Sequence, residues 1–388
     1  MPGTEPTRSR TATPLSARAP WPDVARGAML LLIAVANVHG FLYDRPFGLR
    51  SYPLPQDTAD RVVTFTQMLL VDGRVYPLFG LLVGYGLVRL ARRAERDGPV
   101  AAAGLVARRG AALLLIGALH GILLFSGDIV GAYGLLAVVL AVPIAVRAGF
   151  VLGYATVTGL LLAAVLGAGS GLPRPPGSVP FPSRAEPDVL TALWLRTGEW
   201  LSTGLFGQAI AVLAAVAAGA WWAERMDTAA GDRALLWRVA GTGVAVGVVG
   251  GLPLALMTAG WWTAPGTGIA VAAGVAHTLG GFAAAVGYLA LAMLVATRAG
   301  RTVAALRACG QRSLTCYLTQ SVVFVTLLAP FAGGLGATIG LPAASALAAG
   351  VWLATVLASV AAGRAGLRGP AEALLRRLTY GRAPGPAS

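Results

Sequence analysis

The fold is decided by residues 107–146, which read ARRGAALLLIGALHGILLFSGDIVGAYGLLAVVLAVPIAV. Two long apolar runs in this stretch are joined by a tight polar turn at residues 126–128. Each run approaches the length that crosses the hydrocarbon core of a bilayer, about 17–25 residues. His120 and Asp128 lie beside the turn. The stretch therefore predicts two membrane-spanning helices that carry a polar site at one end.

The composition extends this prediction to the whole chain. Of the 388 residues, 56% are hydrophobic and 12% are charged, whereas soluble domains usually carry about 25% charged residues. Lipid offers backbone N–H and C=O groups no partners, so spanning segments are helices or closed barrels. The apolar runs are continuous rather than alternating with polar residues, which argues against a barrel. We expect an all-α, polytopic membrane protein.

About ten transmembrane helices are expected. The first apolar run resembles the core of a signal peptide, but it continues to Tyr43 and the later chain is itself membrane-embedded, which favours a retained first span. Residues 1–22 are predicted to be a disordered cytoplasmic segment, 23–362 the transmembrane domain with a Pro-rich outer loop at 170–203, and 363–388 a basic cytoplasmic tail. The expected spans lie within residues 23–43, 62–90, 111–125, 129–146, 150–168, 204–223, 239–259, 269–296, 314–331 and 344–362.

The arginines predict the orientation of the chain. The sequence contains no lysine, and its net charge is +14. Cytoplasmic loops of membrane proteins are enriched in basic residues. Alternate loops here are rich in arginine, and the N-terminal segment and the C-terminal tail fall on the arginine-rich side. We therefore expect a multi-pass protein of a bacterial cytoplasmic membrane with both termini in the cytoplasm, and the positive charge does not indicate nucleic-acid binding.

Several polar side chains are expected in the outer half of the membrane. Arg74 interrupts an apolar region, where a charge costs at least about 2.5–3.5 kcal/mol, so it should face protein or water or extend to the interface. All three histidines, His39, His120 and His277, are predicted to lie in this half. Each histidine also has a plain structural explanation, as a buried side chain bonded to a neighbouring helix.

His120 and Asp128 form the strongest candidate site. A carboxylate can orient an imidazole and stabilise its charged form, provided that the turn folds back on the helix. Asp128 directly precedes an apolar run, so it is also a candidate helix N-cap. The two roles are compatible.

A second polar set is expected near the cytoplasmic face. It comprises Asp23, Arg26, Arg108, Arg109, Tyr317 and Gln320. Asp23 and Arg26 have the alternative of a helix cap and a topology anchor. Cys309 and Cys316 are seven residues apart, on what should be one helical face, and neither a disulfide framework nor a metal site follows from them.

Three blocks of sequence resemble the YeiB-like membrane proteins, which carry domain of unknown function 418. They are DVARGAMLLLIAVAN from Asp23, FGLLVGYGL with LLLIGALHGILLFSGDIVGAYGLLAVV, and GQRSLTCYLTQS from Gly310 with GPAEALLRRLTYG from Gly369. The resemblance covers nearly all of the chain beyond residue 20. Where this family usually has an asparagine in the third block, the chain has Cys316, so no role is transferred to that position. The family resembles, at the level of fold, the transmembrane acyltransferases, which have about ten or more spans and an acyl donor that enters from the cytoplasm. Acyltransferase-3 proteins carry an arginine and then a histidine eleven residues later, whereas Arg26 and His39 are thirteen apart.

The resemblance implies an acyltransferase that moves an acyl group from a donor such as acyl-CoA to a hydroxyl- or amine-bearing acceptor. His120 would act as the base, oriented by Asp128. Arg74 would stabilise oxyanion charge or hold an anionic acceptor. Arg26, Arg108 and Arg109 would bind donor phosphates, with Asp23, His39, Tyr317 and Gln320 as further binding residues. The alternatives are a transporter for a small solute and a membrane protein without catalysis, and the sequence indicates no metal and no oligomeric state.

Overall fold

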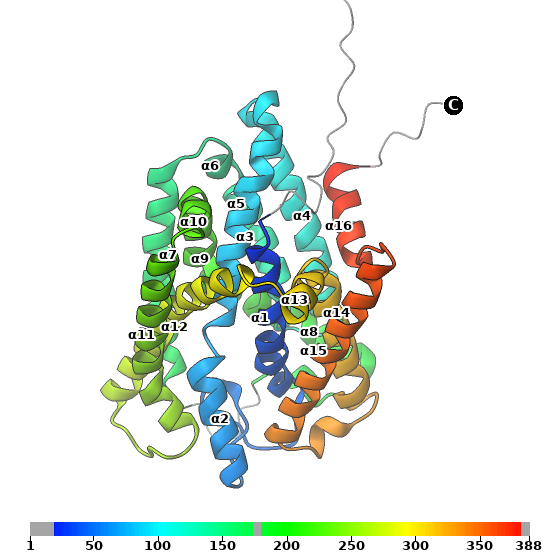
Figure 1. Ribbon diagram of the computed structural model, residues 1–388. Helices are drawn as coiled ribbons and strands as arrows, with labels where there is room; N and C mark the ends of the chain where they lie inside the picture. The colour runs from blue at the N-terminus through cyan, green and yellow to red at the C-terminus, as the bar shows by residue number, and fades with distance from the viewer. Residues whose placement is uncertain (1–18, 174–179, 382–388) are drawn as a thin grey trace, which may run out of the picture.

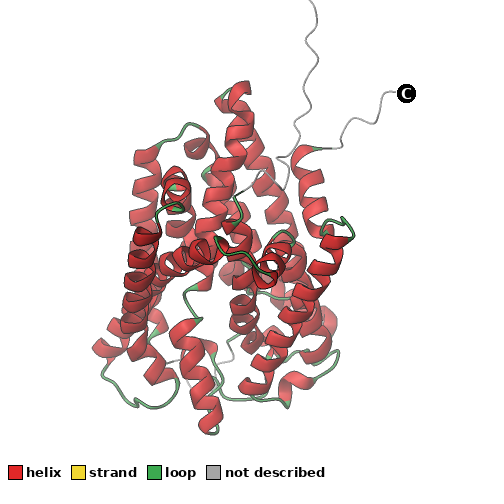
Figure 2. Cartoon of the chain, viewed as in Figure 1, coloured by secondary structure: helices red, strands yellow, loops and turns green. Residues whose placement is uncertain are grey.

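The computed structural model describes residues 19–173 and 180–381, and regular structure within these ranges is helical (Figures 1 and 2). Eight helical runs are long and apolar enough to cross a membrane, and two shorter apolar helices, α5 and α14, bring the total to the expected ten. The chain is therefore a polytopic helical membrane protein. Its α-helices are α1 (Trp21–Val38), α2 (Thr58–Leu70), α3 (Val75–Ala91), α4 (Pro99–Leu123), α5 (Val130–Val139), α6 (Ala141–Ala145), α7 (Gly149–Ser170), α8 (Val189–Glu199), α9 (Gln208–Trp221), α10 (Ala223–Ala229), α11 (Arg233–Thr258), α12 (Thr267–Ala296), α13 (Arg301–Gly310), α14 (Ser313–Leu328), α15 (Leu341–Arg364) and α16 (Pro370–Tyr380).

Short irregular helices connect these elements. The 3₁₀ segments are η2 (His39–Phe41), η3 (Leu49–Ser51), η4 (Arg92–Asp97), η5 (Pro182–Arg184) and η7 (Leu335–Ala337), and η6 (Trp200–Gly207) is a π-helix. In Figure 1, α7, α11 and α12 form one side of the bundle, α13–α16 form the other, and α3–α5 lie between them. Helix α1 packs against α13, α15 and α12, and thereby ties the two sides together.

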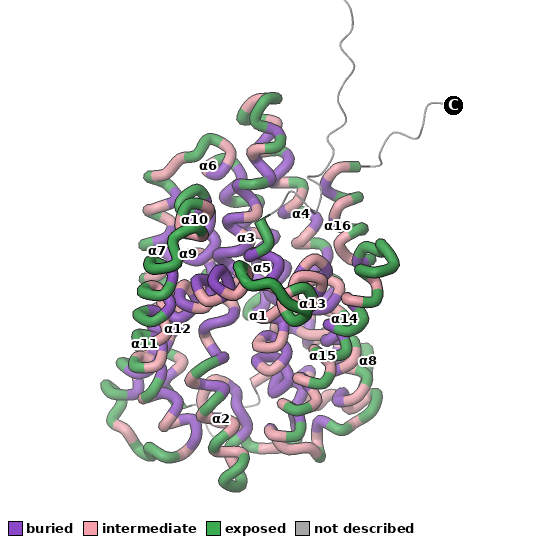
Figure 3. The backbone as a smooth tube through the Cα atoms, in the orientation of Figure 1, coloured by how far each residue is buried: buried purple, intermediate pink, exposed green. Residues whose placement is uncertain are grey.

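The outer surface of the bundle is apolar, as lipid contact requires. Phe150, Tyr154, Leu161 and Val165 on α7 are each more than 60% exposed, and their spacing of four, seven and four residues places them on one face of the helix. Exposed segments alternate with buried ones along the helices in Figure 3. A soluble monomer seldom shows so long an apolar stripe, so this face is assigned to the hydrocarbon core.

Close helix packing relies on small residues. A Cβ atom on Gly84 of α3 would stand 2.0 Å from the carbonyl oxygen of Val216, and one on Gly219 of α9 would stand 2.2 Å from that of Leu81. The two backbones can approach only because both positions are glycine, which is the usual basis of helix association in lipid.

The expected break at residues 72–74 is confirmed, but the hairpin at 107–146 differs from its prediction. Helix α4 begins at Pro99, well before the expected start of this span at residue 111, so the arginine pair at 108–109 lies inside the helix. The second run is divided, because α5 ends at Val139 and α6 is a separate short helix that contains Pro143. Proline lacks an N–H and clashes with the carbonyl four residues earlier, here that of Val139, which explains the division.

Two regions expected outside the spans contain helices. Within residues 170–203 the chain is helical from Val189 onward and continues through η6 into α9. The C-terminal segment contains α16, which packs against α4 and α14. Cys309 and Cys316 are not on one helical face, because the chain turns between α13 and α14, although their sulfur atoms are only 3.8 Å apart. At the other end, α1 begins at Trp21, and the segment expected to be disordered lies, up to residue 18, outside the described residues.

Candidate active site

Three buried side chains from α4, α14 and the turn before α5 form a hydrogen-bonded series. His120 Nδ1 is 2.8 Å from Oδ1 of Asp128, and His120 Nε2 is 2.8 Å from the hydroxyl oxygen of Ser321. None of the three side chains is more than 3% exposed. The two ring nitrogens thus face different partners, a carboxylate on one side and a hydroxyl on the other. The predicted contact between His120 and Asp128 is present, and the serine is an addition that the structure provides. We call Ser321, His120 and Asp128 the triad.

The turn at residues 126–128 positions the carboxylate. Oδ2 of Asp128 accepts a hydrogen bond of 2.7 Å from the backbone N–H of Gly131, in the first turn of α5. One oxygen of Asp128 therefore bonds to the first turn of α5 while the other contacts the imidazole. The N-cap residue of α5 is Ile129, so Asp128 lies one residue before the cap position rather than at it, but its bond to the Gly131 N–H still holds the carboxylate in the direction of His120.

Glycines allow the two helices to meet at the triad. A Cβ on Gly117 would stand 2.1 Å from the backbone nitrogen of Gly131 and 2.7 Å from Oδ2 of Asp128, and one on Gly121 would stand 2.0 Å from the Trp200 ring. Trp200 begins the π-helix η6, a conformation that is rare and often found at functional sites. The triad is thus enclosed by α4, α5 and η6.

Gly117→Ala is expected to lower the melting temperature and displace Asp128 from His120. The added methyl group must push the backbone of α5 away, and overpacking of this kind costs about 1–3 kcal/mol. Thermal unfolding of the detergent-purified protein measures the effect. Gly104→Ala is the matched control, since it lies on the same helix with no atom within 4 Å of the new methyl group. Equal melting temperatures for the two variants would contradict the close approach of α4 and α5.

A second buried cluster surrounds Arg74. We define the Arg74 cluster as Arg50, Asp72, Arg74 and His277. Arg74 Nη1 is 2.5 Å from the carbonyl oxygen of Asp72 and 3.1 and 3.2 Å from the two ring nitrogens of His277, and Nη2 donates to the carbonyl of Gly247 at 2.8 Å. Arg50 Nη2 is 2.5 Å from Oδ1 of Asp72, and His277 Nε2 is 3.5 Å from the same oxygen. Arg74 is fully buried, so it faces protein, as expected, and does not extend to the interface.

Aromatic side chains lie between the two groups. Tyr76 donates to the Oδ1 atom of Asn37 at 2.6 Å, and Tyr133 donates to the backbone oxygen of Tyr76 at 2.8 Å. His39 stacks on Tyr52 with ring centroids 4.1 Å apart. Burial, followed by the charge of Asp72, raises the pKa of Tyr52 well above its ordinary value, which keeps the phenol protonated.

The residues expected near the cytoplasmic face do not form one group. Asp23 and Arg26 pair at 3.3 Å near the start of α1, while Arg108 is exposed and Arg109 half-buried on α4. Tyr317 instead packs on His120, with ring centroids 4.8 Å apart and a tilt of 49°. Its neighbour on α14, Gln320, donates to the carbonyl of Leu30 at 3.4 Å. Tyr317 and Gln320 therefore lie close to His120 and to α1, where α13 crosses beside α1 in mid-bundle and α14 begins (Figure 1).

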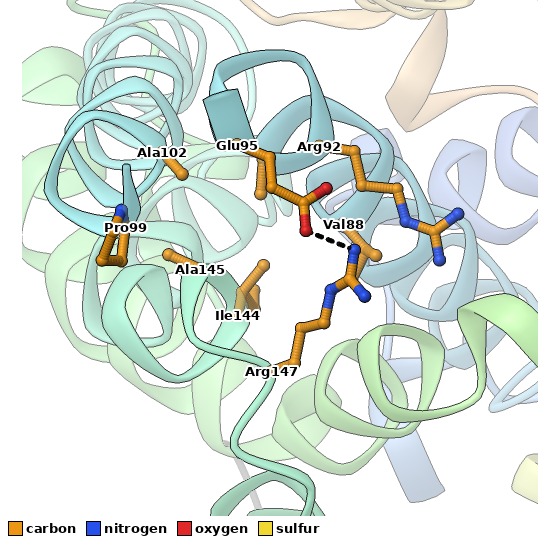
Figure 4. A pocket seen from close by; sticks show the side chains of 9 residues that line it. Val88, Arg92, Glu95, Pro99, Ala102, Ile144, Ala145 and Arg147 are labelled. Atoms are coloured by element: carbon orange, nitrogen blue, oxygen red, sulfur yellow. Dashed lines mark hydrogen bonds and ion pairs between the residues drawn. The ribbon is translucent and has the colours of Figure 1, made fainter. Parts of the chain in front are cut away.

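A cavity of about 140 Å³ lies at the opposite end of the bundle, between α3, α4 and α6 (Figure 4). Its lining includes Arg92, Glu95 and Arg147. The Arg147 guanidinium pairs with Glu95 at 2.8 Å and Arg92 pairs with Glu224. Since acids already neutralise both arginines, the cavity offers little attraction to phosphate groups.

Comparison with known proteins finds a family match in the C-terminal part of the chain. Residues 220–382 match the family described as "Protein of unknown function (DUF418)". This range contains the third resembling block, with Ser321, but neither of the first two blocks and neither His120 nor Asp128. The chain is also 32% identical over 123 residues to the uncharacterized protein YxaH of Bacillus subtilis (strain 168), and this match spans 30% of either chain. From Ala220 at the end of α9 to the residue after Gly381, the chain is thus similar to DUF418, a family of unknown function.

Proposed function

We propose that the protein is an acyltransferase of the cytoplasmic membrane, with both termini in the cytoplasm. In this proposal the triad transfers an acyl group from a thioester donor such as acyl-CoA to a hydroxyl- or amine-bearing acceptor. The observation that carries the proposal is the contact of one imidazole with a carboxylate at 2.8 Å and with a serine hydroxyl at 2.8 Å. Nucleophile, base and orienting carboxylate in this order are the arrangement that activates serine in acyl transfer on several unrelated folds.

The proposed reaction has two steps, acylation of Ser321 and transfer of the acyl group to the acceptor. Ser321 Oγ attacks the thioester carbonyl as His120 Nε2 takes its proton, the C–S bond breaks, and the thiol leaves with that proton. The acceptor then loses a proton to His120 as it attacks the acyl-serine ester, and the Ser321 oxygen leaves and regains the proton. Asp128 stays ionised throughout and stabilises the imidazolium that forms in each step.

The donor is proposed to reach the triad from the arginine-rich end of the bundle. Arg26, Arg108 and Arg109 remain the candidates for its phosphates, with bidentate guanidinium contacts as the mode of binding. Arg26 is already paired with Asp23. Arg108 is exposed, so it is better placed than Arg26 to meet a soluble donor. The acceptor is considered below.

A transporter is the second candidate, and the Arg74 cluster is the observation that favours it. Ionisable residues within membrane spans commonly mark the path of a solute or a proton, and Arg74 and His277 are both fully buried. In this case the triad would be a structural tie between α4 and α14, and a solute would cross a liposome membrane without any consumption of thioester.

Incubation of the purified full-length protein with acyl-CoA, followed by mass spectrometry, tests the proposal. We expect release of CoA and an added acyl mass on the peptide that contains Ser321. A fluorophosphonate, which labels activated serines, should label the wild type and fail to label Ser321→Ala. If no CoA is released, and both proteins carry the same label, the triad is not an acyl-transfer centre.

A further inference from the structure

We infer that the Arg74 cluster is the binding site for an anionic group, a phosphate or a carboxylate, carried by the ligand. Anion binding is inferred from the charge, hydrogen bonding and backbone conformation of the cluster. That the bound anion belongs to the acyl acceptor rests in addition on the proposed function.

The first observation is the charge of the cluster. The cluster holds two guanidinium groups and one carboxylate: Arg50 pairs with the Asp72 carboxylate, and Arg74 donates to the backbone carbonyl of Asp72. Arg74 satisfies its other contacts with the neutral carbonyl of Gly247 and with the His277 ring. Whatever the charge on His277, the four residues carry a net positive charge of at least one. A buried charge without a counter-charge costs several kcal/mol, and a bound anion would remove that cost.

The second observation is a set of buried polar atoms that lack a hydrogen-bond partner among the described residues. They are the hydroxyl of Tyr52, Nδ1 of His39, and the Nε atoms of Arg50 and Arg74. Tyr52 is completely buried, and it interacts electrostatically with Asp72, Arg50 and Arg74. Buried polar groups in native proteins are nearly always paired. Three of the four atoms carry a hydrogen to donate, and an anion is the ligand that accepts from several donors at once.

The third observation is the backbone that brings Arg50 to the cluster. Arg50 has φ +52° and Ser51 has φ +64°, in the left-handed region that residues other than glycine seldom adopt. Such conformations are energetically unfavourable and are concentrated at functional sites. Here the strained turn η3 points a second guanidinium at the Asp72 carboxylate, which His277 also contacts, while Arg74 bonds to the backbone carbonyl of the same residue. The Arg50 side chain keeps 24% of its surface exposed, so a ligand can enter from this end of the bundle.

Thermal unfolding of the full-length protein in neutral phosphatidylcholine nanodiscs tests the inference. Inorganic phosphate and acetate are the probes, titrated against chloride at constant ionic strength. We expect phosphate or acetate to raise the melting temperature of the wild type. Arg50→Gln should weaken this binding by at least about tenfold, as expected for a lost charge-assisted hydrogen bond. The matched control is Arg61→Gln, which removes a guanidinium that donates to a single carbonyl, Gly260, at 2.9 Å.

Tyr52→Phe keeps the test valid if Arg50→Gln does not fold. It removes one hydroxyl from a side chain whose packing is otherwise preserved, and it should weaken phosphate binding several-fold. In nanodiscs that contain phosphatidylglycerol, full stabilisation without added phosphate would identify a lipid headgroup as the source of the anion. Phosphate that still adds stability in those nanodiscs would identify a soluble ligand.

Two results would overturn the inference. One is that neither the anions nor phosphatidylglycerol raises the melting temperature of the wild type. The other is that Arg50→Gln and Arg61→Gln lose anion binding to the same extent. The test does not depend on catalysis. Anion binding together with an unlabelled Ser321 would refute the proposed function alone, whereas a labelled Ser321 without anion binding would refute this inference alone.

Discussion

Ser321→Ala is expected to lower the rate of acyl transfer by at least about 10³-fold, with little change in folding. The hydroxyl is the proposed acyl carrier, and loss of one member of a nucleophile–base pair removes nearly all of the catalysis that the pair provides. The substitution deletes one atom from a buried site without adding bulk. Release of CoA from acyl-CoA measures the rate, and thermal unfolding measures the fold.

The matched control is Thr326→Val, which removes another hydroxyl from α14. Thr326 is exposed and donates to the carbonyl of Val322 within its own helix, so its loss should leave the rate unchanged. His120→Gln should be as inactive as Ser321→Ala, and the double variant should be no worse than either, because the two residues act as a unit. A rate for Ser321→Ala near that of the wild type would show that the hydroxyl carries no acyl group.

Asp72→Asn is expected to destabilise the protein by about 3–5 kcal/mol, the usual cost when one partner is removed from a buried ion pair. Burial alone would lower the pKa of Arg50, but the Asp72 carboxylate reverses this and raises it. The asparagine would leave Arg50 and Arg74 as two positive charges without a carboxylate. Denaturant unfolding in detergent micelles measures the difference in free energy.

The control for this variant is Asp57→Asn. Asp57 is exposed and caps α2 through the backbone N–H of Asp60 at 2.8 Å, and asparagine caps helices about as well as aspartate. Its stability should therefore match that of the wild type. If Asp72→Asn were equally neutral, the carboxylate would not be the counter-charge of the cluster.

Much of the fold could be predicted from the sequence because lipid imposes simple rules on composition. Continuous apolar runs give the spans, and the polar turn at 126–128 gives the pairing of His120 with Asp128, since the two residues are only eight apart. The division at Val139 could also have been predicted, because Pro143 signals it. The start of α4 at Pro99 was harder to predict, because hydropathy indicates where a chain enters lipid and not where its helix begins.

Contacts between residues far apart in the chain could not be predicted from the sequence. Ser321 lies 201 residues from His120, and Arg74 lies 203 residues from His277. A serine in an apolar helix usually bonds to a carbonyl of its own helix, so nothing in its surroundings distinguishes it. The one available signal was its position four residues after Tyr317, which places both side chains on the same helical face. Asn37 was missed for the same reason, because its partner Tyr76 comes from another helix.

The separation of the triad along the chain has a consequence for biogenesis. The imidazole and carboxylate enter the membrane early in synthesis, whereas the hydroxyl follows roughly 200 residues later. Under the proposed function, the nascent protein would hold a base without its nucleophile until Ser321 on α14 reached His120. Acyl transfer would then begin only in the finished molecule, and the translocation machinery and neighbouring lipids would be spared premature acylation.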